Sequence, residues 1–277
     1  RIANGLWFRS DSVLPSFVQT NTDYYGSQLG DMSGIPQSVN DWVSRETNGH
    51  ITQILPEQDY SGTIAVLVNA VYFNGTWTSK FDPKLTVDAP FTLLDGSTES
   101  VKMMHQVANF EFYKGEGFKA VRLPYGEDKR LRMTLLLPDE GVTLASLLPN
   151  LTASAWRSWK SLYTIANVTL DLPRFNADYS VALKDTLTGM GMGIAFDATG
   201  KANLEGIAKN AYLQFVQHKA FVEVSEEGTK AGGATSIGIG VTSVPTPQTM
   251  KIDRPFFCVL EDSQTGAILF MGSIIKP

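Results

Sequence analysis

The segment from Glu226 to Val241, EEGTKAGGATSIGIGV, alternates with a period of two from Thr229 onward. One parity carries threonine, alanine and all the aliphatic residues, and the other carries Lys230 and mostly glycine and serine. A period of two is typical of a strand with one buried face. The small residues, and the prolines just beyond at 245 and 247, are instead typical of an exposed loop. The segment therefore suits two states, an exposed loop and a strand whose inward face is small at its start and aliphatic at its end. An ordinary glycine-rich edge strand is the alternative.

Apolar patterning in the rest of the chain predicts a mixture of helices and strands. Helical spacing covers 35–49 and ends near Gly49, whereas the continuous apolar run at 63–73 predicts a strand buried on both faces. Further elements follow from shorter patterns: strands at 131–137 and 165–172, a short helix at 180–189 ended by Gly189 and Gly191, and a hairpin formed by 256–260 and 267–274. No internal repeat or linker divides the chain.

Composition indicates a folded globule. The 277 residues are 43% hydrophobic and 18% charged, which suits one domain with a sizeable core. A net charge of −5 without a basic run gives no indication of nucleic-acid binding. No run of 18 apolar residues predicts a membrane span. Sequons begin at Asn74, Asn150 and Asn167 and would matter in a eukaryotic secretory host.

Signals for catalysis or cofactor binding are weak. The three histidines, His50, His105 and His218, show no metal-ligand spacing, and no G-x-S-x-G nucleophile motif is present. The GMGMG run at 189–193 lacks the full dinucleotide-binding pattern. Cys258 is the only cysteine and lies in an apolar strand, so we expect a buried structural thiol. We expect no metal, no cofactor and no enzymatic activity.

The flanks of the alternating segment resemble a family signature. QHKAFVEVSEEGTKA at 217–231 and DRPFFCVLEDSQTGAILFMGSI at 253–274 are similar to the signature of the serpin family. NGLWF at 4–8, VNDWVSRETNGHI at 39–51 and LVNAVYFNGTWTSKF at 67–81 match further serpin segments in the family's order. The resemblance extends over essentially the whole chain.

The resemblance implies an α+β serpin fold. Such a fold has a large central mixed sheet that accepts an inserted reactive-loop strand, two further sheets and surrounding helices. Residues 1–277 would form a single domain with a reactive loop at about 226–250. Because the family has helices and a strand before the segment matched by NGLWF, we expect these N-terminal helices to be missing from this chain.

The function implied by the resemblance is inhibition of a serine endopeptidase by a suicide-substrate mechanism. The protease attacks the exposed loop and forms an acyl-enzyme, and the cleaved loop then inserts into the large sheet and traps the enzyme. Family spacing places the reactive bond between Thr242 and Ser243, with a shift by one residue to Val241 or Ser243 as the alternative. Small or β-branched residues here favour a protease with a shallow specificity pocket, elastase-like or subtilisin-like. The resemblance further implies an extracellular monomer that can polymerise through its loop and sheet, with no nucleic-acid or membrane partner.

The same resemblance implies which residues act. The hinge at the start of the loop consists of Glu226, Glu227, Gly228, Thr229, Lys230, Ala231, Gly232, Gly233, Ala234 and Thr235. It departs from the family pattern, which prefers an acidic residue at Lys230 and alanines at Gly232 and Gly233.

Four residues match positions where the large sheet opens. His218 matches a histidine beneath the centre of the sheet that hydrogen-bonds the asparagine matched by Asn69. Trp77 matches a tryptophan near the place where the loop first enters, and Arg174 matches the partner of Glu226 in a charged pair there. From the residues alone, each of these is an ordinary packing residue or a solvated charge.

Two other classes of function remain. A non-inhibitory serpin relative, a carrier or chaperone-type binding protein, would carry bulky or charged hinge residues, whereas Thr229, Ala231, Ala234 and Thr235 are small. An enzyme on a mixed α/β fold would need catalytic motifs that this chain lacks.

Overall fold

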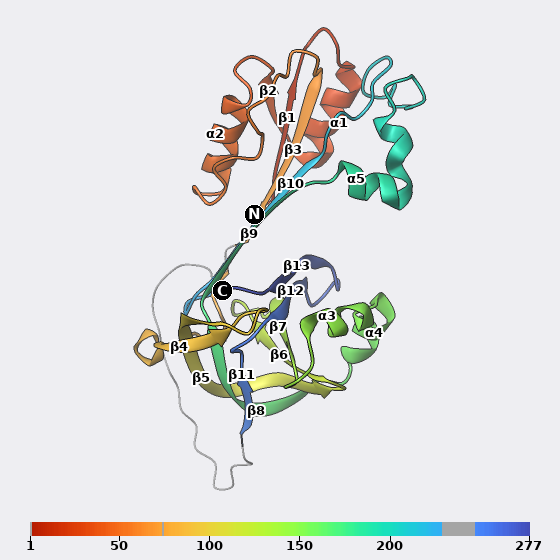
Figure 1. Cartoon of the computed structure of the whole chain (residues 1–277). Coiled ribbons are helices and arrows are strands. Elements are labelled where there is room, and N and C mark those ends of the chain that lie inside the picture. Colours follow the sequence, from red (N-terminus) through yellow and green to blue (C-terminus); the bar gives the residue numbers. More distant parts are fainter. Residues whose placement is uncertain (1, 74, 229–246) are drawn as a thin grey trace. The chain divides into compact units, whose positions relative to one another are not determined.

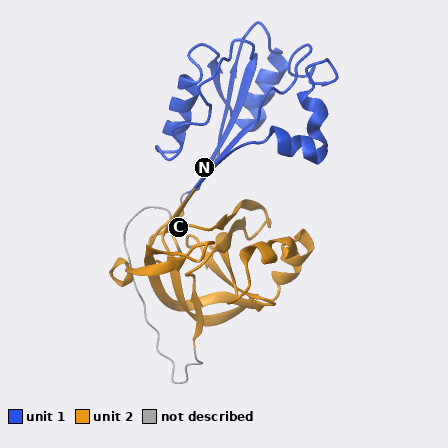
Figure 2. Ribbon diagram, in the orientation of Figure 1, with its two compact units in different colours: residues 1–73, 178–222 blue, residues 74–177, 223–277 orange. Residues whose placement is uncertain are grey.

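The computed structural model describes residues 2–73, 75–228 and 247–277 and divides into two compact units. Unit 1 comprises Arg1–Phe73 and Asp178–Val222, and unit 2 comprises Asn74–Ala177 and Glu223–Pro277 (Figure 2). Each unit has its own sheet and its own hydrophobic core. That 1–277 behave as a single domain stays a prediction.

Unit 1 is built on a five-stranded mixed sheet with the order β2-β1-β3-β10-β9 (Figure 1). Strand β1 is parallel to β2 and antiparallel to β3, and β3 is parallel to β10. In chain order the elements are β1 (Ile2–Phe8), α1 (Pro15–Tyr25), β2 (Gln28–Asp31), α2 (Gln37–Glu46), β3 (Ala65–Tyr72), β9 (Phe175–Ala182), α5 (Lys184–Leu187) and β10 (Gln217–Val224).

Helix α2 covers one face of this sheet, and the helix predicted at 35–49 is confirmed. Its apolar side buries Val39 and Val43 completely. Trp42 on the same side meets Trp7 of β1 edge to face, with ring centroids 5.1 Å apart. Edge-to-face contact is the preferred geometry for such a pair. The helical period therefore anchors α2 over β1 and β3.

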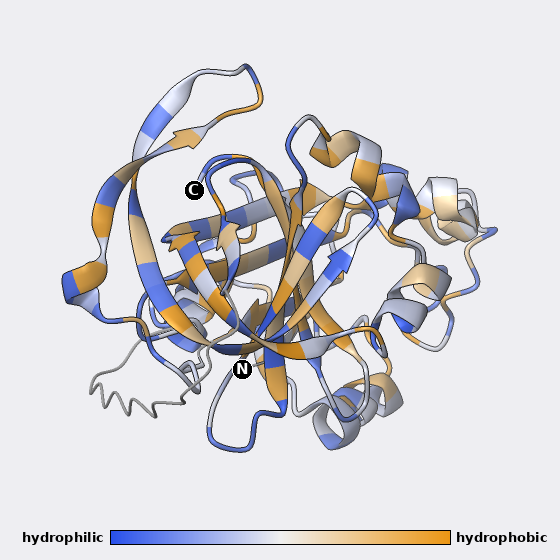
Figure 3. Ribbon diagram, turned by 90° about the horizontal axis from the view of Figure 1, so that it is seen from below, coloured by the Kyte–Doolittle hydropathy of each residue, from blue (hydrophilic) through white to orange (hydrophobic). Residues whose placement is uncertain are grey.

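Strand β3 corrects one expectation. The apolar run at 63–73 forms a strand, but only alternate residues are buried, and Leu67 on the other face is 54% exposed. A continuous apolar run permits burial of both faces of a strand. Whether both faces are buried depends on the elements that pack against them. Alternating hydropathy is visible along several other strands (Figure 3).

The short helix predicted at 180–189 is also shifted. Residues through Ala182 belong to β9, and α5 begins only at Lys184. A π-helical turn, Thr188–Met192, follows and contains Gly191 at φ 99°, a conformation that favours glycine. The glycines therefore mark the end of regular helix, as predicted.

Unit 2 contains an eight-stranded sheet: seven strands follow the order β11-β8-β5-β6-β7-β12-β13, and β4 is the eighth, paired with β5. Its long strand β5 pairs with β4, β6 and β8 along its length, so the strands expected in two smaller sheets are continuous here. The elements are β4 (Val87–Thr92), β5 (Thr98–Gly115), β6 (Phe118–Pro124), β7 (Leu131–Pro138), α3 (Leu144–Leu147), α4 (Ala153–Trp159), β8 (Thr164–Pro173), β11 (Gln248–Lys251), β12 (Phe256–Asp262) and β13 (Ile268–Ile274). The strands predicted at 131–137 and 165–172 and the hairpin near the C-terminus are confirmed.

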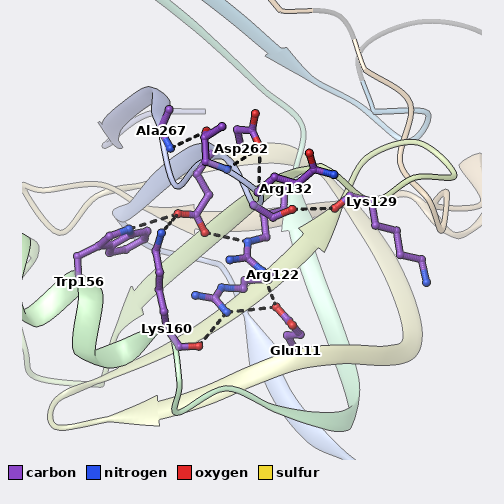
Figure 4. Close-up of polar contacts among 12 residues, drawn as sticks. Glu111, Arg122, Lys129, Arg132, Trp156, Lys160, Asp262 and Ala267 are labelled. Carbon is purple, nitrogen blue, oxygen red and sulfur yellow. Dashed lines mark hydrogen bonds and ion pairs between the residues drawn. The ribbon is translucent and has the colours of Figure 1, made fainter.

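A buried network of charges joins α4 to this sheet (Figure 4). The carboxylate of Glu261 on β12 is fully buried and lies 2.8 Å from Nε of Arg132 and 3.1 Å from Nζ of Lys160. Arg132 also lies 3.3 Å from Glu111 on β5. Burial raises the pKa of Glu261, but the hydrogen bonds and charges of Arg132 and Lys160 outweigh it, so the pKa lies below its ordinary value. Glu261 therefore stays ionised inside the core.

We expect Arg132→Met to destabilise the protein by about 3 kcal/mol, because it removes a cation from the fully buried carboxylate of Glu261 and from Glu111. The matched control is Lys102→Met, which breaks an exposed 2.9 Å pair with Asp88 and should cost less than about 1 kcal/mol. Urea unfolding monitored by circular dichroism measures both. Equal losses in the two variants would show that the buried network contributes no more than a surface pair.

Candidate functional site

The chain reverses immediately after β10, at the start of the predicted hinge. Ser225 and Gly228 exchange two backbone hydrogen bonds of 3.0 and 3.1 Å, with Glu226 and Glu227 as the two residues of the turn. This is the bonding of a two-residue β-hairpin turn. A strand that continued from it would run antiparallel to β10.

Trp77 and its neighbours hold this turn in place. The backbone N–H of Trp77 donates to the carbonyl of Glu227 at 3.0 Å, and its indole N–H donates to the carbonyl of Ser225 at 2.9 Å. The buried Trp77 ring stacks on Tyr125, with centroids 4.1 Å apart. Phe81 adds a third bond, from its N–H to the carbonyl of Glu226 at 2.9 Å. The turn is thus fixed by backbone as well as side-chain contacts.

The carboxylate of Glu226 is the electrostatic anchor of the turn. It is only 4% exposed as a residue and accepts hydrogen bonds from Arg174 Nε and Nη2 at 2.8 and 2.6 Å, and from the hydroxyl of Thr86. Burial raises the pKa of Glu226, but the bonds from Arg174 and Thr86 outweigh it, so the pKa lies below its ordinary value. Arg174 and Glu226, which the resemblance matched to a charged pair of the family, are in contact. Their role in sheet opening stays a prediction.

Position 228 requires glycine for two reasons, its positive φ angle and the lack of room for a Cβ atom. Its φ is +107°, and a Cβ added there would lie 2.2 Å from the carbonyl oxygen of Gly75 and 2.6 Å from the backbone nitrogen of Trp77. Backbone atoms cannot move aside as the end of a side chain can. The glycine therefore lets the turn lie directly against 75–77.

Within unit 1, the ladder between β3 and β10 is short. Among the described residues, the two parallel strands pair at Val71 with Ala220 and at Tyr72 with Phe221. Beyond this point lies a cavity of about 330 Å³, lined by residues 62–68, 209–217, Ile54 and Leu55. Most of the β3 edge that faces β10 is thus without a strand partner among the described residues.

The expected bond between His218 and Asn69 is not formed. The side-chain amide of Asn69 donates to Oδ1 of Asn4 at 2.8 Å, and no hydrogen bond joins it to His218 in the part of the chain that the structure describes. His218 precedes the paired part of β10, so the ladder does not bring it against Asn69. The described residues thus show Asn69 bonded to Asn4, and a role of His218 and Asn69 in sheet opening stays a prediction.

Much of the predicted reactive loop lies outside the described residues. These include the hinge from Thr229 to Thr235 and the reactive bond between Thr242 and Ser243. At the two ends of the range 226–250, Glu226–Gly228 lie in the turn and Gln248 begins strand β11, which pairs with β8. The described residues thus fix where the loop leaves and rejoins the fold.

Some contributors were missed from the sequence. Thr86 on Glu226 and Tyr125 under Trp77 carry no local motif, because each meets its partner only through tertiary contact. Only the neighbouring Pro124 and Gly126 mark Tyr125 as the end of a strand.

The described residues contain no group of three or more histidine, cysteine or acidic side chains that could hold a metal ion. Among these residues no helix is long and apolar enough to cross a membrane. Cys258 lies in β12 and is partly rather than fully buried, and burial of its thiol raises the pKa to about 12.

The fold and the turn after β10 define a serpin. The family model described as Serpin (serine protease inhibitor) matches residues 1–277, and the chain therefore belongs to the serpin family. Serpins are protease inhibitors rather than enzymes as a family, although some members bind small molecules instead. The α+β fold with a large mixed sheet is thereby confirmed.

Individual relatives are longer than this chain. Serpin B3 of Homo sapiens is 38% identical over 277 residues, which cover 96% of this chain and 69% of that protein. A leukocyte elastase inhibitor of Xenopus laevis is 34% identical, covering 96% and 74% respectively. Among solved structures, native tengpin, a thermophilic serpin, has a TM-score of 0.88 at 29% identity and covers 100% of this chain and 73% of its own. Thyroxine-binding globulin in complex with thyroxine has a TM-score of 0.86 at 25% identity, covering 100% and 75%.

We expect Gly228→Ala to destabilise the protein by about 3 kcal/mol or to displace the turn, because strain at positive φ adds to a clash with backbone. Gly141→Ala is the matched control: Gly141 also has a positive φ, 80°, but nothing lies within 4 Å of its added Cβ. That control should lose about 1 kcal/mol. Thermal and urea unfolding compare the two, and similar losses would mean that the close approach to 75–77 is unimportant.

The Glu226–Arg174 pair predicts a pH dependence. A carboxylate whose pKa is lowered by folding contributes stability above its unfolded-state pKa, and this contribution is lost as the pH falls through the folded-state pKa. Arg174→Met should therefore cost about 1–3 kcal/mol at neutral pH, reduced by the partial exposure of Arg174, and nearly nothing once Glu226 is protonated in both proteins. Unfolding free energies of wild type and variant, measured from neutral pH down to about pH 3, test this. A difference that is independent of pH would assign the loss to packing.

Proposed function

We propose that this serpin inhibits a serine protease by inserting its cleaved reactive loop between β3 and β10. The observation that carries the proposal is the incomplete ladder between these two strands. Because β3 and β10 are parallel, one strand running antiparallel to both can pair with each of them. The unpaired edge of β3 and the adjoining cavity provide the place for it.

The direction of insertion follows from the turn at Ser225–Gly228. If a strand continued this antiparallel pairing, Thr229 would lie opposite Val224, Ala231 opposite Val222, and Thr235 opposite His218. Val222 and Val224 are both buried. Residues opposite one another share a face, so the parity of small and aliphatic residues in 229–241 would be the buried one.

This register accounts for the order of side chains along the loop. Small residues enter first, next to the anchored turn, and the aliphatic residues Ile237, Ile239 and Val241 follow toward the cavity. Burial of each aliphatic side chain would contribute roughly 1.5–3 kcal/mol. His218, whose predicted contact with Asn69 is absent, would then face the inserted strand.

The target would be a serine protease with a shallow specificity pocket, elastase-like or subtilisin-like, cleaving between Thr242 and Ser243. Support comes from the small residues at this position and from relatives named leukocyte elastase inhibitor. The extracellular location, the monomeric state and polymerisation through the loop stay predictions.

A carrier function is the second candidate. Its support is the likeness to thyroxine-binding globulin and, within unit 2, an apolar cavity of about 630 Å³ lined by residues of α4, β12 and β13. Such a protein would bind a small hydrophobic ligand without trapping protease.

The test mixes an elastase-like serine protease with the protein. We expect a band at the combined mass that survives denaturation, and mass spectrometry of the released peptide should place the cut after Thr242. Complete cleavage without that band would reject the trap, and binding of a hydrophobic probe by the same sample would then support the carrier.

Thr229→Arg tests the register in the same assay. An arginine opposite the buried Val224 would have to enter the core, so we expect about a tenfold or greater loss of the trapped complex in favour of cleaved product. Lys230→Glu is the control, because position 230 has the opposite parity and already carries a charge; it should trap as the wild type does. Normal trapping by Thr229→Arg would reject the proposed register.

A further inference from the structure

His50 lies where the described residues of β3 and β10 are paired. Its ring stacks on Tyr72 of β3 with centroids 4.8 Å apart, and it packs at a tilt of 30° against Phe221 of β10 with centroids 4.7 Å apart. Tyr72 and Phe221 are direct partners in the ladder, so their side chains lie on the same face. One imidazole thus contacts both strands at the end of their short ladder.

The position of the His50 ring is fixed by its own backbone. Two residues in the left-handed region, Asn48 and Gly49, end helix α2, and the N–H of Gly49 donates to the carbonyl of Ser44 at 2.7 Å. The N–H of His50 then donates to the carbonyl of Thr47 at 3.1 Å.

The residues on either side of His50 add to this anchoring. The fully buried Ile51 donates its N–H to the hydroxyl of Thr47 at 3.0 Å, and that hydroxyl donates to the carbonyl of Val43 at 2.8 Å. His50 is therefore carried on a hydrogen-bonded turn that belongs to neither β3 nor β10.

We propose that His50 is a positioning residue that clamps β3 to β10 and sets how readily they part. The ladder consists of only two residue pairs, so two additional ring contacts are a large share of what joins the strands. For a loop strand to insert between β3 and β10, both of these residue pairs must separate. The effect of the clamp on loop insertion rests on the proposed function. The clamp itself involves only residues of unit 1.

The test measures hydrogen exchange by mass spectrometry in peptides covering 66–73 and 217–224. We expect His50→Ala to speed exchange in both segments about tenfold, since it removes both ring contacts. His50→Phe keeps a ring that can stack and should restore wild-type exchange. Peptides covering 2–8, in β1 of the same sheet, and 256–262, in unit 2, are internal controls that should not change.

Two results would overturn the clamp: exchange at 66–73 and 217–224 that His50→Ala leaves unchanged, or an equal increase at 2–8, which would indicate general loosening of unit 1. Because exchange is measured on the inhibitor alone, the clamp can be confirmed even where the protease is not trapped. Where the wild type does trap, faster separation should raise the share of protease trapped by His50→Ala. A lower share would overturn the link between the clamp and insertion.

Discussion

Ser225 and Gly228 pair with each other across two residues, and this reversal determines where the chain can go after β10. Everything else at the site serves to keep that turn in place. Trp77 and Phe81 donate hydrogen bonds to three of its carbonyls. Because Gly228 has no Cβ, the backbone of 75–77 can lie directly against the turn. A strand continued from this turn would run antiparallel to β10, and the edge of β10 that faces β3 is where the described ladder is short.

Charge and burial act together at this turn. A carboxylate as buried as Glu226 would be costly to keep ionised without the two nitrogens of Arg174 and the hydroxyl of Thr86. The same solution appears at Glu261 in unit 2, where Arg132 and Lys160 hold a fully buried carboxylate. Whether such pairs add stability over apolar residues depends on context, but each fixes one geometry because the partners cannot be exchanged. In this protein the Glu226–Arg174 pair holds the turn after β10, and the pairs of Glu261 hold the end of α4 against the sheet.

The short ladder between β3 and β10 contrasts with the complete ladder between β1 and β3, where seven residue pairs are formed. Backbone groups along the free part of the β3 edge are available to another strand, which is the usual hazard of an edge. Here the incomplete pairing of β3 underlies both the risk of pairing with another chain and the proposed loop insertion. A sheet that can accept its own loop must have an edge that a foreign strand could also use, and contacts such as those of His50 limit how far that edge opens.

Local pattern alone determined a good part of this protein. The helical period at 35–49, the alternation in β8 and the hairpin of β12 and β13 were predictable because each depends on residues close in the chain. The resemblance paired Glu226 with Arg174, and these side chains are in contact, although nothing local pairs residues 52 positions apart. What only the tertiary structure decided were the contacts of Thr86, Tyr125 and His50, the exposure of Leu67 and the missing bond between His218 and Asn69. Each of these depends on which strands come together and over what length, and that is set by packing across the sheet rather than by any period in the sequence.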